Sequence, residues 1–412
     1  MSGQSRRTTD ASRRRIELAD ILREHGTSLL RHGSFPRHHR RVMHRIMACR
    51  TAALGGQVRW CERCGFEDYV YHSCRDRHCP KCQTHAKEQW REARQLELLP
   101  VPYFHHVLTL PHELNAWILA SEGNQRALLR LLFDAASATL LKFGRAELGG
   151  EVGFTLVLHT WDQLLRPHFH LHGLMASGAL SADGERWIAG GKDFLFAVRA
   201  LSKVFRGKFL AGFESLLCGG ALTLPRDFGP GGKHPRALVR RLYRKSWVVY
   251  SKPPFAGPAK LLDYLSRYTH RVAISNDRLI RCKSDSVEFF YRDRRDGDRR
   301  KLTSLPPETF LRRFLCHVLP ERFTRIRHYG FLANRHRREK LEKIRRLVGM
   351  RRRPDEVMPA TLEWVAQLLG VDRNRCPRCD APLCVAALPR DERYWQQARP
   401  RLEIRGSPER PP

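Results

Sequence analysis

The sequence predicts an α+β protein with a small zinc-ribbon-like domain ahead of a larger domain, and three observations support this fold class. Two β-rich runs, 153–160 and 168–175, are joined by a short polar connection, which is typical of an antiparallel hairpin. Segments such as 193–217 have the periodicity of helices instead. Six of the 12 cysteines fall within residues 49–85. At 412 residues the chain is long enough for two or three domains.

The chain is strongly basic, and this charge indicates a polyanionic partner. Lys and Arg number 75 against 42 Asp and Glu, which gives a net charge of +33. A metabolic enzyme has no use for such a field, whereas DNA binds more tightly when basic side chains release its counterions. The charge alone is equally compatible with RNA. A membrane partner is not expected, because the sequence contains no amphipathic anchor segment.

The chain is expected to be intracellular. Its longest apolar stretches, such as LLRLLFD, fall far short of the ~20 residues that span a bilayer. The first residues, MSGQSRRTTDASRRR, lack the apolar core of a signal peptide. We therefore expect a cytoplasmic protein. Its cysteines are then expected to be metal ligands or buried thiols rather than disulfides.

Periodicity and turn residues predict the remaining elements. Alternating apolar residues favour strands, and apolar residues three or four apart favour helices. In chain order we expect a helix over 86–100, a strand over 104–111, one or two helices over 112–143, a strand over 246–258, a helix over 259–271, strands over 278–284 and 286–293, and a helix over 307–320. After the last strand, an Asp-Gly pair predicts the turn of a further hairpin.

Five regions follow from these elements and from local composition. They are a basic helical region over 1–48, a zinc-binding domain with its connecting helix over 49–100, the large domain over 101–320, a basic helical DNA-binding segment over 321–353, and a C-terminal region over 354–412 with a CxxC knuckle and a disordered tail. The fourth region carries 13 Lys and Arg against 3 Glu.

The cysteine-rich segment has the spacing of a structural zinc site. Cys61, Cys64, Cys79 and Cys82 form two CxxC pairs separated by fourteen residues. Each pair can present two thiolates on one side of a tight turn, and two such turns can close a tetrahedral site. Alternative ligands lie within or near the loop: Cys74, His78, His72 and Cys49. Buried thiols or a redox pair would be the other explanation.

Two further features accompany this segment. Its basic residues Arg75, Arg77 and Lys81 are expected to form an outward cationic surface that docks on DNA. A second CxxC near the C-terminus, Cys376 and Cys379, is followed by Cys384. Only three cysteines are present there, so a zinc ion at this place would need a ligand from elsewhere in the chain.

A histidine cluster indicates a second kind of metal site. His170 and His172 alternate on a predicted strand, so they face the same way about 6.6 Å apart. His159 can approach them from the neighbouring strand of the hairpin. Neutral imidazoles are common ligands of catalytic divalent metals. His168 and Gln163 are alternative third ligands, and the alternative explanation is that these histidines are merely satisfied polar residues on a sheet.

Tyr264 and Tyr268 lie four residues apart on a predicted helix and are therefore neighbours on one face. A phenolate can attack phosphorus and form a phosphotyrosine that conserves the energy of the broken phosphodiester. Arg267 and Arg271, or a metal ion, could favour the phenolate. A tyrosine pair alone is more often core packing, and only the histidine cluster favours the catalytic interpretation.

The sequence contains the motifs LHTWDQ, HFHLHGLM, VVYSKPPF, YLSRYTHRVAIS and RIRHYGFLANRHR. With these motifs the chain resembles the transposases of the insertion-sequence-91 family, which are two-tyrosine members of the HUH endonuclease superfamily. In addition CRTAALGG, SCRDRHCPKCQ and LLPVPYFHHVLTLP resemble the zinc-binding region of that family. The resemblance covers about residues 30–345.

The resemblance implies a fold, an activity and site residues. The fold is an open, mostly antiparallel sheet that carries the histidine motif on a central strand and is flanked by helices. By this resemblance His170 and His172 match the HUH pair, Tyr264 and Tyr268 match the nucleophiles, and related relaxases place a third metal histidine near the position of His159. Mg²⁺ or Mn²⁺ is the implied catalytic ion. Phe169 stands where the family tends to have proline, and MASGALSADG keeps only part of its glycine-rich turn.

The implied function is rolling-circle transposition of single-stranded DNA through 5′-phosphotyrosine intermediates, with host replication machinery as a further partner. Five basic residues are candidate DNA contacts: Lys252, Arg267, Arg271, Arg335 and Arg337. Two alternatives share the chemistry, namely a plasmid or phage replication initiator and a conjugative relaxase. A third, of another class, is a zinc-dependent DNA-binding protein without catalysis. The DNA that is cut distinguishes an initiator or a relaxase from a transposase. The formation of covalent protein–DNA adducts distinguishes all three enzymes from a binding protein.

Overall fold

The computed structural model describes residues 15–33, 35–229, 232–253, 260, 262–263, 266, 273–350, 372 and 374–391. The expected disordered tail falls almost wholly outside these residues, as does most of the expected helix over 259–271. Within the described part of the chain, no helix is both long and apolar enough to cross a membrane.

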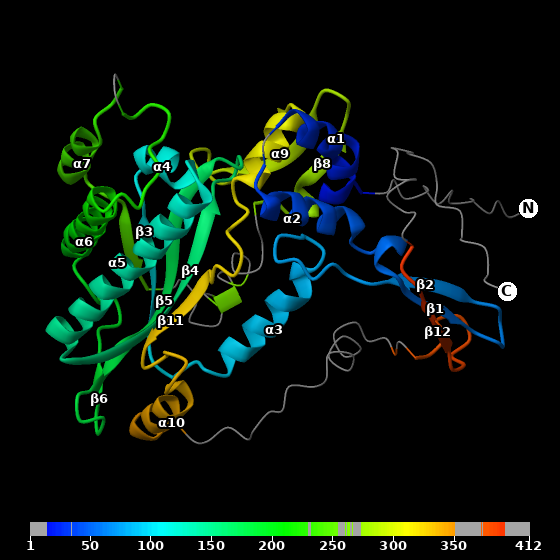
Figure 1. Ribbon diagram of the computed structural model, residues 1–412. Coiled ribbons are helices and arrows are strands. Elements are labelled where there is room, and N and C mark those ends of the chain that lie inside the picture. Colours follow the sequence, from blue (N-terminus) through cyan, green and yellow to red (C-terminus); the bar gives the residue numbers. More distant parts are fainter. Residues whose placement is uncertain are drawn as a thin grey trace, which may run out of the picture.

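An antiparallel sheet of six strands forms the centre of the large domain (Figure 1). Its order is β11-β4-β5-β3-β7, and β6 pairs with the end of β5. The strands are β3 (Tyr103–Thr109), β4 (Gly150–Trp161), β5 (Pro167–Ser181), β6 (Trp187–Ala189), β7 (Val249–Lys252) and β11 (Ile326–Gly330). The predicted hairpin of 153–160 and 168–175 is confirmed as β4 and β5, and β5 lies at the centre of the sheet.

Helices cover one face of this sheet (Figure 1). They are α4 (Asn115–Leu119), α5 (Glu122–Leu148), α6 (Val198–Cys218) and α7 (Pro235–Arg244), and a short 3-10 turn, His112–Leu114, precedes α4. α5 begins where the Ser121 hydroxyl accepts a hydrogen bond from the amide of Asn124 at 3.0 Å, and it ends at Gly149 in the left-handed region.

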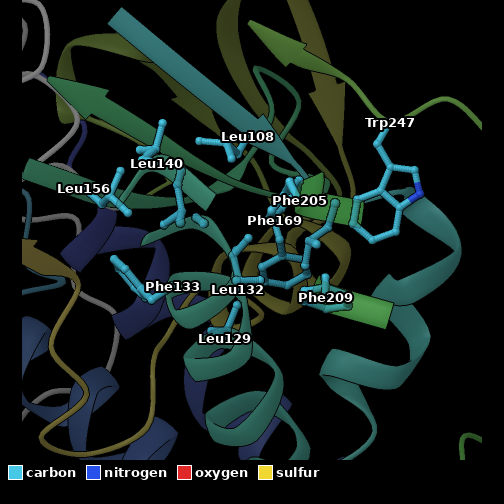
Figure 2. Packing of buried hydrophobic residues seen from close by; sticks show 14 of the residues in the cluster. Leu108, Leu129, Leu132, Phe133, Leu140, Leu156, Phe169, Phe205, Phe209 and Trp247 are labelled. Atoms are coloured by element: carbon cyan, nitrogen blue, oxygen red, sulfur yellow. The ribbon is translucent and has the colours of Figure 1, made fainter. Parts of the chain in front are cut away.

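The core between helices and sheet explains which strand residues remain for a site. Phe169 and Leu171 of β5 are buried against α5 and α6, together with Leu132, Phe205 and other residues shown in Figure 2. Because successive strand residues alternate between faces, the residues between them point to the opposite side of the sheet. The alternation of HFHLH therefore places its histidines on the face away from these helices.

His106 is a buried histidine in this core. This residue of β3 is 0% exposed and lies between the rings of Phe104 and Phe196, and neither ring nitrogen has a hydrogen-bond partner among the residues that the structure describes. Burial lowers the pKa of His106 to about 3 from an ordinary 6.5, so the ring is neutral in the folded protein. Such an unsatisfied polar group opposes folding.

Replacing His106 with methionine is expected to stabilise the protein, by about 1–3 kcal/mol at neutral pH, because it removes the unsatisfied group and fills a similar volume. In the wild type, His106 binds a proton below about pH 6.5 in the unfolded chain, but only below about pH 3 in the folded protein. The free energy of unfolding therefore decreases as the pH is lowered from 6.5 to 3. The advantage of the variant should widen by about 2 kcal/mol at pH 5. Urea unfolding at both pH values measures it; equal pH slopes for the two proteins would contradict the account.

A second core joins the N-terminal helices to a small sheet. α1 (Leu18–His32) and α2 (Arg37–Ala48) pack with β8 (Leu279–Cys282), β9 (Val287–Asp293), β10 (Arg299–Leu305) and α9 (Pro307–Leu315) in one buried cluster. A 3-10 turn, Asn276–Arg278, precedes β8. The expected β9–β10 hairpin is confirmed, with Gly297 at φ 57° in its turn. The expected separation of 1–48 from 101–320 is therefore not seen, because the apolar faces of α1 and α2 are buried against a distant segment.

The segment 321–353 was expected to be helical, and this is only partly correct. α10 (Arg337–Leu347) is a helix, but β11 is an edge strand of the central sheet, where Ile326 lies opposite Val157 and His328 opposite Thr155. The basic composition of this segment hid the alternating pattern of Ile326–Gly330, which becomes a strand only by pairing with β4. The large domain thus extends past residue 320.

A third, small sheet has the order β12-β1-β2, and α3 (Gln83–Gln95) leads from this region into the large domain. Its strands are β1 (Gly56–Trp60), β2 (Glu67–Tyr71) and β12 (Cys384–Leu388), preceded by a 3-10 turn at Ala52–Leu54. Two of these strands lie near the start of the chain and one near its end, and Figure 1 shows them side by side.

Candidate functional site

Three histidines meet on the face of the central sheet that lies opposite α5 and α6. His159 on β4 is directly paired with His170 on β5, and the Nδ1 atom of His159 lies 2.9 Å from Nε2 of His170. Nε2 of His170 lies 3.1 Å from Nε2 of His172. The three ligand atoms are within 4.8 Å of one another. The structure therefore brings together the three histidines that the sequence singled out.

The electrostatics of the cluster favour neutral imidazoles. Burial lowers the pKa of His170 to about 3 and holds the pKa values of His159 and His172 well below their ordinary range, with the neighbouring histidines adding to the effect. All three rings are thus neutral at physiological pH, which leaves a lone pair on one nitrogen of each.

The spacing fits a divalent cation. Two nitrogens about 2.1 Å from one ion at a right angle lie about 3.0 Å apart, and the two shortest distances of the cluster match this value. The Nδ1 atom of His170 lies 2.9 Å from the carbonyl oxygen of His168, which makes Nδ1 the protonated nitrogen and leaves Nε2 for the ion.

The two alternative ligands are not part of the cluster. The His168 side chain is exposed, and its ring lies beside that of His170 with centroids 4.7 Å apart, but its nitrogens are not among the three that converge. Gln163 contacts the turn before β8 and strand β9: its carbonyl accepts a hydrogen bond from Arg278, and its side-chain oxygen lies 3.5 Å from the amide of Arg292.

His105 is a neighbour that the sequence reasoning missed. Its Nε2 lies 2.9 Å from Nδ1 of His172, and the two rings stack with centroids 5.2 Å apart. This contact orients His172 so that its Nε2 points at the cluster, as a second-layer partner of a metal-bound histidine does. The signal was present in FHHVLTLP: His105 lies on the histidine face of β3, opposite Leu174. Only the strand pairing reveals it.

The edge strand β7 places two more side chains on the same face. Tyr250 lies opposite Val107 and Lys252 opposite His105. Both are exposed, and the Lys252 ammonium lies 5.0 Å from the centre of the Tyr250 ring. The Tyr250 ring is in turn 6.3 Å from that of His105. An exposed aromatic ring and a cation thus stand next to the histidines.

The two tyrosines lie outside the described residues, as do Arg267 and Arg271. Their described neighbours are informative. Leu262 is buried in a cluster that includes Leu174, two positions after His172 on the same face of β5. Asp263 approaches Arg91 of α3 at 3.4 Å. The chain therefore reaches the histidine face of the sheet two residues before Tyr264.

The cysteines of the zinc-binding region do not form the expected single site. Cys79 and Cys82 meet Cys49 and Cys74, with sulfurs of Cys49 and Cys74 at 3.4 and 3.6 Å from that of Cys82. Cys61 and Cys64 lie in another cluster. The prediction of one ion on Cys61, Cys64, Cys79 and Cys82 is thus wrong, because the β1–β2 hairpin separates the two CxxC turns. In a tetrahedral zinc site, thiolate sulfurs 2.3 Å from the ion lie about 3.8 Å apart. The sulfur–sulfur distances in the cluster of Cys49, Cys74, Cys79 and Cys82 are close to this value.

The basic residues of this loop are mostly turned inward. The Arg77 guanidinium donates hydrogen bonds to the carbonyl oxygens of Leu319, Pro320 and Phe323. Lys81 forms an ion pair with Glu17 at 2.5 Å. Only Arg75 is exposed, so the expected cationic surface is not formed by these three residues.

His78, an alternative zinc ligand, contacts a carboxylate instead of the cysteines. It is buried with Nδ1 2.9 Å from the Asp76 carboxylate and lies outside both cysteine clusters. In the basic segment, Arg337 forms an ion pair with Glu97 at 3.2 Å, whereas Arg335 is exposed. Of the candidate DNA contacts that the structure describes, Lys252 and Arg335 present their charges outward.

Two family models match parts of this chain. A family model described as "Transposase zinc-binding domain" matches residues 21–110, and one described as "Putative transposase" matches residues 153–340. Together they define a transposase with its own zinc-binding domain. No solved structure matches the chain.

Two curated relatives extend over most of the chain. The "Putative transposase y4qJ" of Sinorhizobium fredii is 44% identical over 88% of this chain and 92% of its own length. The transposase for insertion sequence element IS801 of Pseudomonas savastanoi pv. phaseolicola is 28% identical over 83% and 82%. The chain therefore belongs to the insertion-sequence-91 family of transposases, as its motifs indicated, and DNA is its partner.

Proposed function

We propose that this transposase cuts and rejoins single-stranded DNA at the ends of its element, by rolling-circle transposition through 5′-phosphotyrosine intermediates. The observation that carries the proposal is the buried, neutral cluster of His159, His170 and His172, on the sheet face where the chain is buried two residues before Tyr264. A binding protein would gain nothing from neutral histidines gathered at such a place.

The histidines have a positioning role in the proposed reaction. Mg²⁺ or Mn²⁺ bound there would supply Lewis-acid polarisation of the scissile phosphate. The rigid pairing of β4 and β5 holds the three nitrogens, while His105 and the carbonyl of His168 hold the rings in the required tautomers. No rearrangement of the ligands is then needed when DNA arrives.

The tyrosines carry the covalent step. The phenolate oxygen of one tyrosine attacks the phosphorus, and the bond from phosphorus to the 3′ oxygen breaks. The 5′ phosphate remains on the tyrosine, and the leaving oxygen takes up a proton to become a free 3′ hydroxyl. In the reverse direction a 3′ hydroxyl attacks the phosphotyrosine and seals the strand. Because the bond energy is conserved, no nucleotide cofactor is needed, although strand displacement would require host replication enzymes.

Tyr250 and Lys252 are proposed to receive the DNA strand beside the histidines. Replacing both with alanine is expected to weaken single-stranded DNA binding about 10- to 100-fold, because a stacked base is worth about 1–3 kcal/mol and a phosphate contact adds to it. Fluorescence anisotropy with a labelled oligonucleotide at two salt concentrations measures the loss.

The matched control for this prediction is Tyr243→Ala, which removes an exposed tyrosine from α7. Its affinity should stay within about twofold of the wild type. Equal losses in both variants would show that β7 has no special role.

The proposal is tested by covalent capture. Purified protein is incubated with labelled single strands from the ends of the element, with Mg²⁺ or with EDTA, and denaturing gels reveal protein–DNA adducts. Mass spectrometry of the digested adduct should place the nucleotide on the peptide that contains Tyr264 and Tyr268. Parallel strands from replication and transfer origins separate a transposase from an initiator or a relaxase. Absence of adducts on every strand, with DNA binding intact, would favour a zinc-dependent binding protein.

A further inference from the structure

We propose that Cys61, Cys64, Cys376 and Cys379 hold a second zinc ion, and that this ion attaches the C-terminal region to the zinc-binding domain. The matching family model for zinc binding ends at residue 110, so it does not include the last two cysteines. The four sulfurs lie within 4.8 Å of one another, although Cys64 and Cys376 are 312 residues apart. The inference concerns the architecture of the protein and is independent of the cleavage chemistry.

The sulfur positions fit a zinc ion. The sulfur of Cys61 lies 3.5 Å from that of Cys379, and the sulfur of Cys64 lies 3.5 Å from that of Cys376. These distances approach the edges of about 3.8 Å of a tetrahedral thiolate site. They are far longer than the 2.05 Å of a disulfide bond. Each CxxC contributes two ligands, which is the arrangement of a zinc ribbon.

The two CxxC turns have the same backbone hydrogen bonds, which is independent support for a shared ion. In the first, the amide of Gly65 donates to the carbonyl of Cys61 at 2.9 Å, and the amide of Cys61 donates to Phe66 at 2.8 Å. In the second, the amide of Asp380 donates to Cys376 at 2.9 Å, and the amide of Cys376 donates to Ala381 at 2.8 Å.

The residue after each CxxC is left-handed: Gly65 has φ 66° and Asp380 has φ 60°. Such a conformation costs energy in an aspartate, and it allows the chain to turn sharply around the two sulfurs. In the second turn the amide of Arg378 also donates to the sulfur of Cys376 at 3.4 Å, a contact that stabilises a thiolate. Two segments far apart in the sequence thus share one metal-binding geometry.

The small sheet joins the same two segments. β12 pairs antiparallel with β1, so that Trp60 lies opposite Cys384 and Gly56 opposite Leu388. None of the buried apolar clusters found among the described residues includes a residue of β1, β2 or β12. The Arg378 guanidinium over the Phe66 ring at 5.3 Å is a modest contact. A three-stranded sheet without a core needs another source of stability, and a metal ion supplies it in small domains.

The zinc content of the full-length protein tests the proposal. Native mass spectrometry is expected to find two zinc ions per wild-type chain and one in the Cys376→Ser/Cys379→Ser variant. The matched control is Cys384→Ser, which changes the neighbouring cysteine that lies outside the cluster and should keep two ions. One ion in the wild type, or two in the double variant, would overturn the proposal.

A second measurement uses only the wild-type protein, so its result does not depend on whether the cysteine variants fold. Wild-type protein is treated with iodoacetamide, with and without a strong zinc chelator, and the labelled cysteines are mapped. Cys61, Cys64, Cys376 and Cys379 should be protected together and become reactive together, while the exposed Cys218 is labelled throughout. Labelling of Cys376 and Cys379 while Cys61 and Cys64 remain protected would contradict a shared ion.

Discussion

Replacing Tyr264 and Tyr268 together with phenylalanine is expected to abolish covalent protein–DNA adducts. Phenylalanine keeps the ring and removes only the oxygen that attacks phosphorus. Loss of a nucleophile typically costs several orders of magnitude, so cleavage should fall on the order of 10⁴-fold or more. Binding of the single strand should stay near the wild-type level, because the cationic and aromatic side chains of β7 are unchanged. The adduct gel and an anisotropy titration on the same preparation measure both effects.

The single variants refine this prediction. If the two tyrosines alternate, Tyr264→Phe and Tyr268→Phe should each retain one cleavage and lose completed strand transfer. Tyr243→Phe is the matched control, because it removes the hydroxyl of a tyrosine exposed on α7. Adducts that persist in the double variant would exclude these residues as the nucleophiles.

Replacing His170 with alanine is expected to reduce metal-dependent cleavage at least about 100-fold. His170 is the middle member of the cluster, in contact with both His159 and His172, so its loss removes a ligand and both contacts. Partners in the second layer of a metal site are worth about 10- to 100-fold, and a direct ligand should be worth no less. Mn²⁺ binding followed by electron paramagnetic resonance provides a readout that does not depend on activity.

Two neighbouring histidines calibrate the result. His105→Phe should weaken Mn²⁺ binding about 10- to 100-fold, because it frees the ring of His172 without removing a ligand. His168→Ala should have an effect within about threefold, since the exposed His168 ring is not a ligand, and alanine retains the carbonyl that orients His170. A loss in His168→Ala equal to that in His170→Ala would show that the ion is held elsewhere.

The histidine site was largely predictable from the sequence because its geometry is local. A strand has a period of two, so the spacing of His170 and His172 places both rings on one face wherever the strand lies. The short connection to the preceding run makes the hairpin the natural pairing, which brings His159 opposite His170. His105 was not predicted because it lies 65 residues before His170 in the sequence. The pairing of β3 with β5 brings it next to His172, and no local pattern specifies that pairing.

The cysteines illustrate the opposite case. Each CxxC is a local feature that the sequence shows directly, and the sequence analysis left open whether the C-terminal one holds an ion. Which of these turns come together depends on the tertiary fold, because β12 pairs with β1 and brings Cys376 next to Cys64, 312 residues away in the sequence. The spacing predicted that Cys61 and Cys64 share an ion with Cys79 and Cys82, but the first pair lies in the turn of the β1–β2 hairpin and belongs to another cluster.

The sequence by itself determined the family, the strongly basic character, the alternation of the histidines and the local CxxC turns, because each depends on composition or on residues within a few positions of one another. Only the tertiary structure decided the partner of each CxxC, the place of β11 in the sheet and the burial of α1 and α2 against α9. These are contacts between distant segments. They are selected by the burial of apolar faces and by strand pairing across the whole fold, which local patterns do not encode.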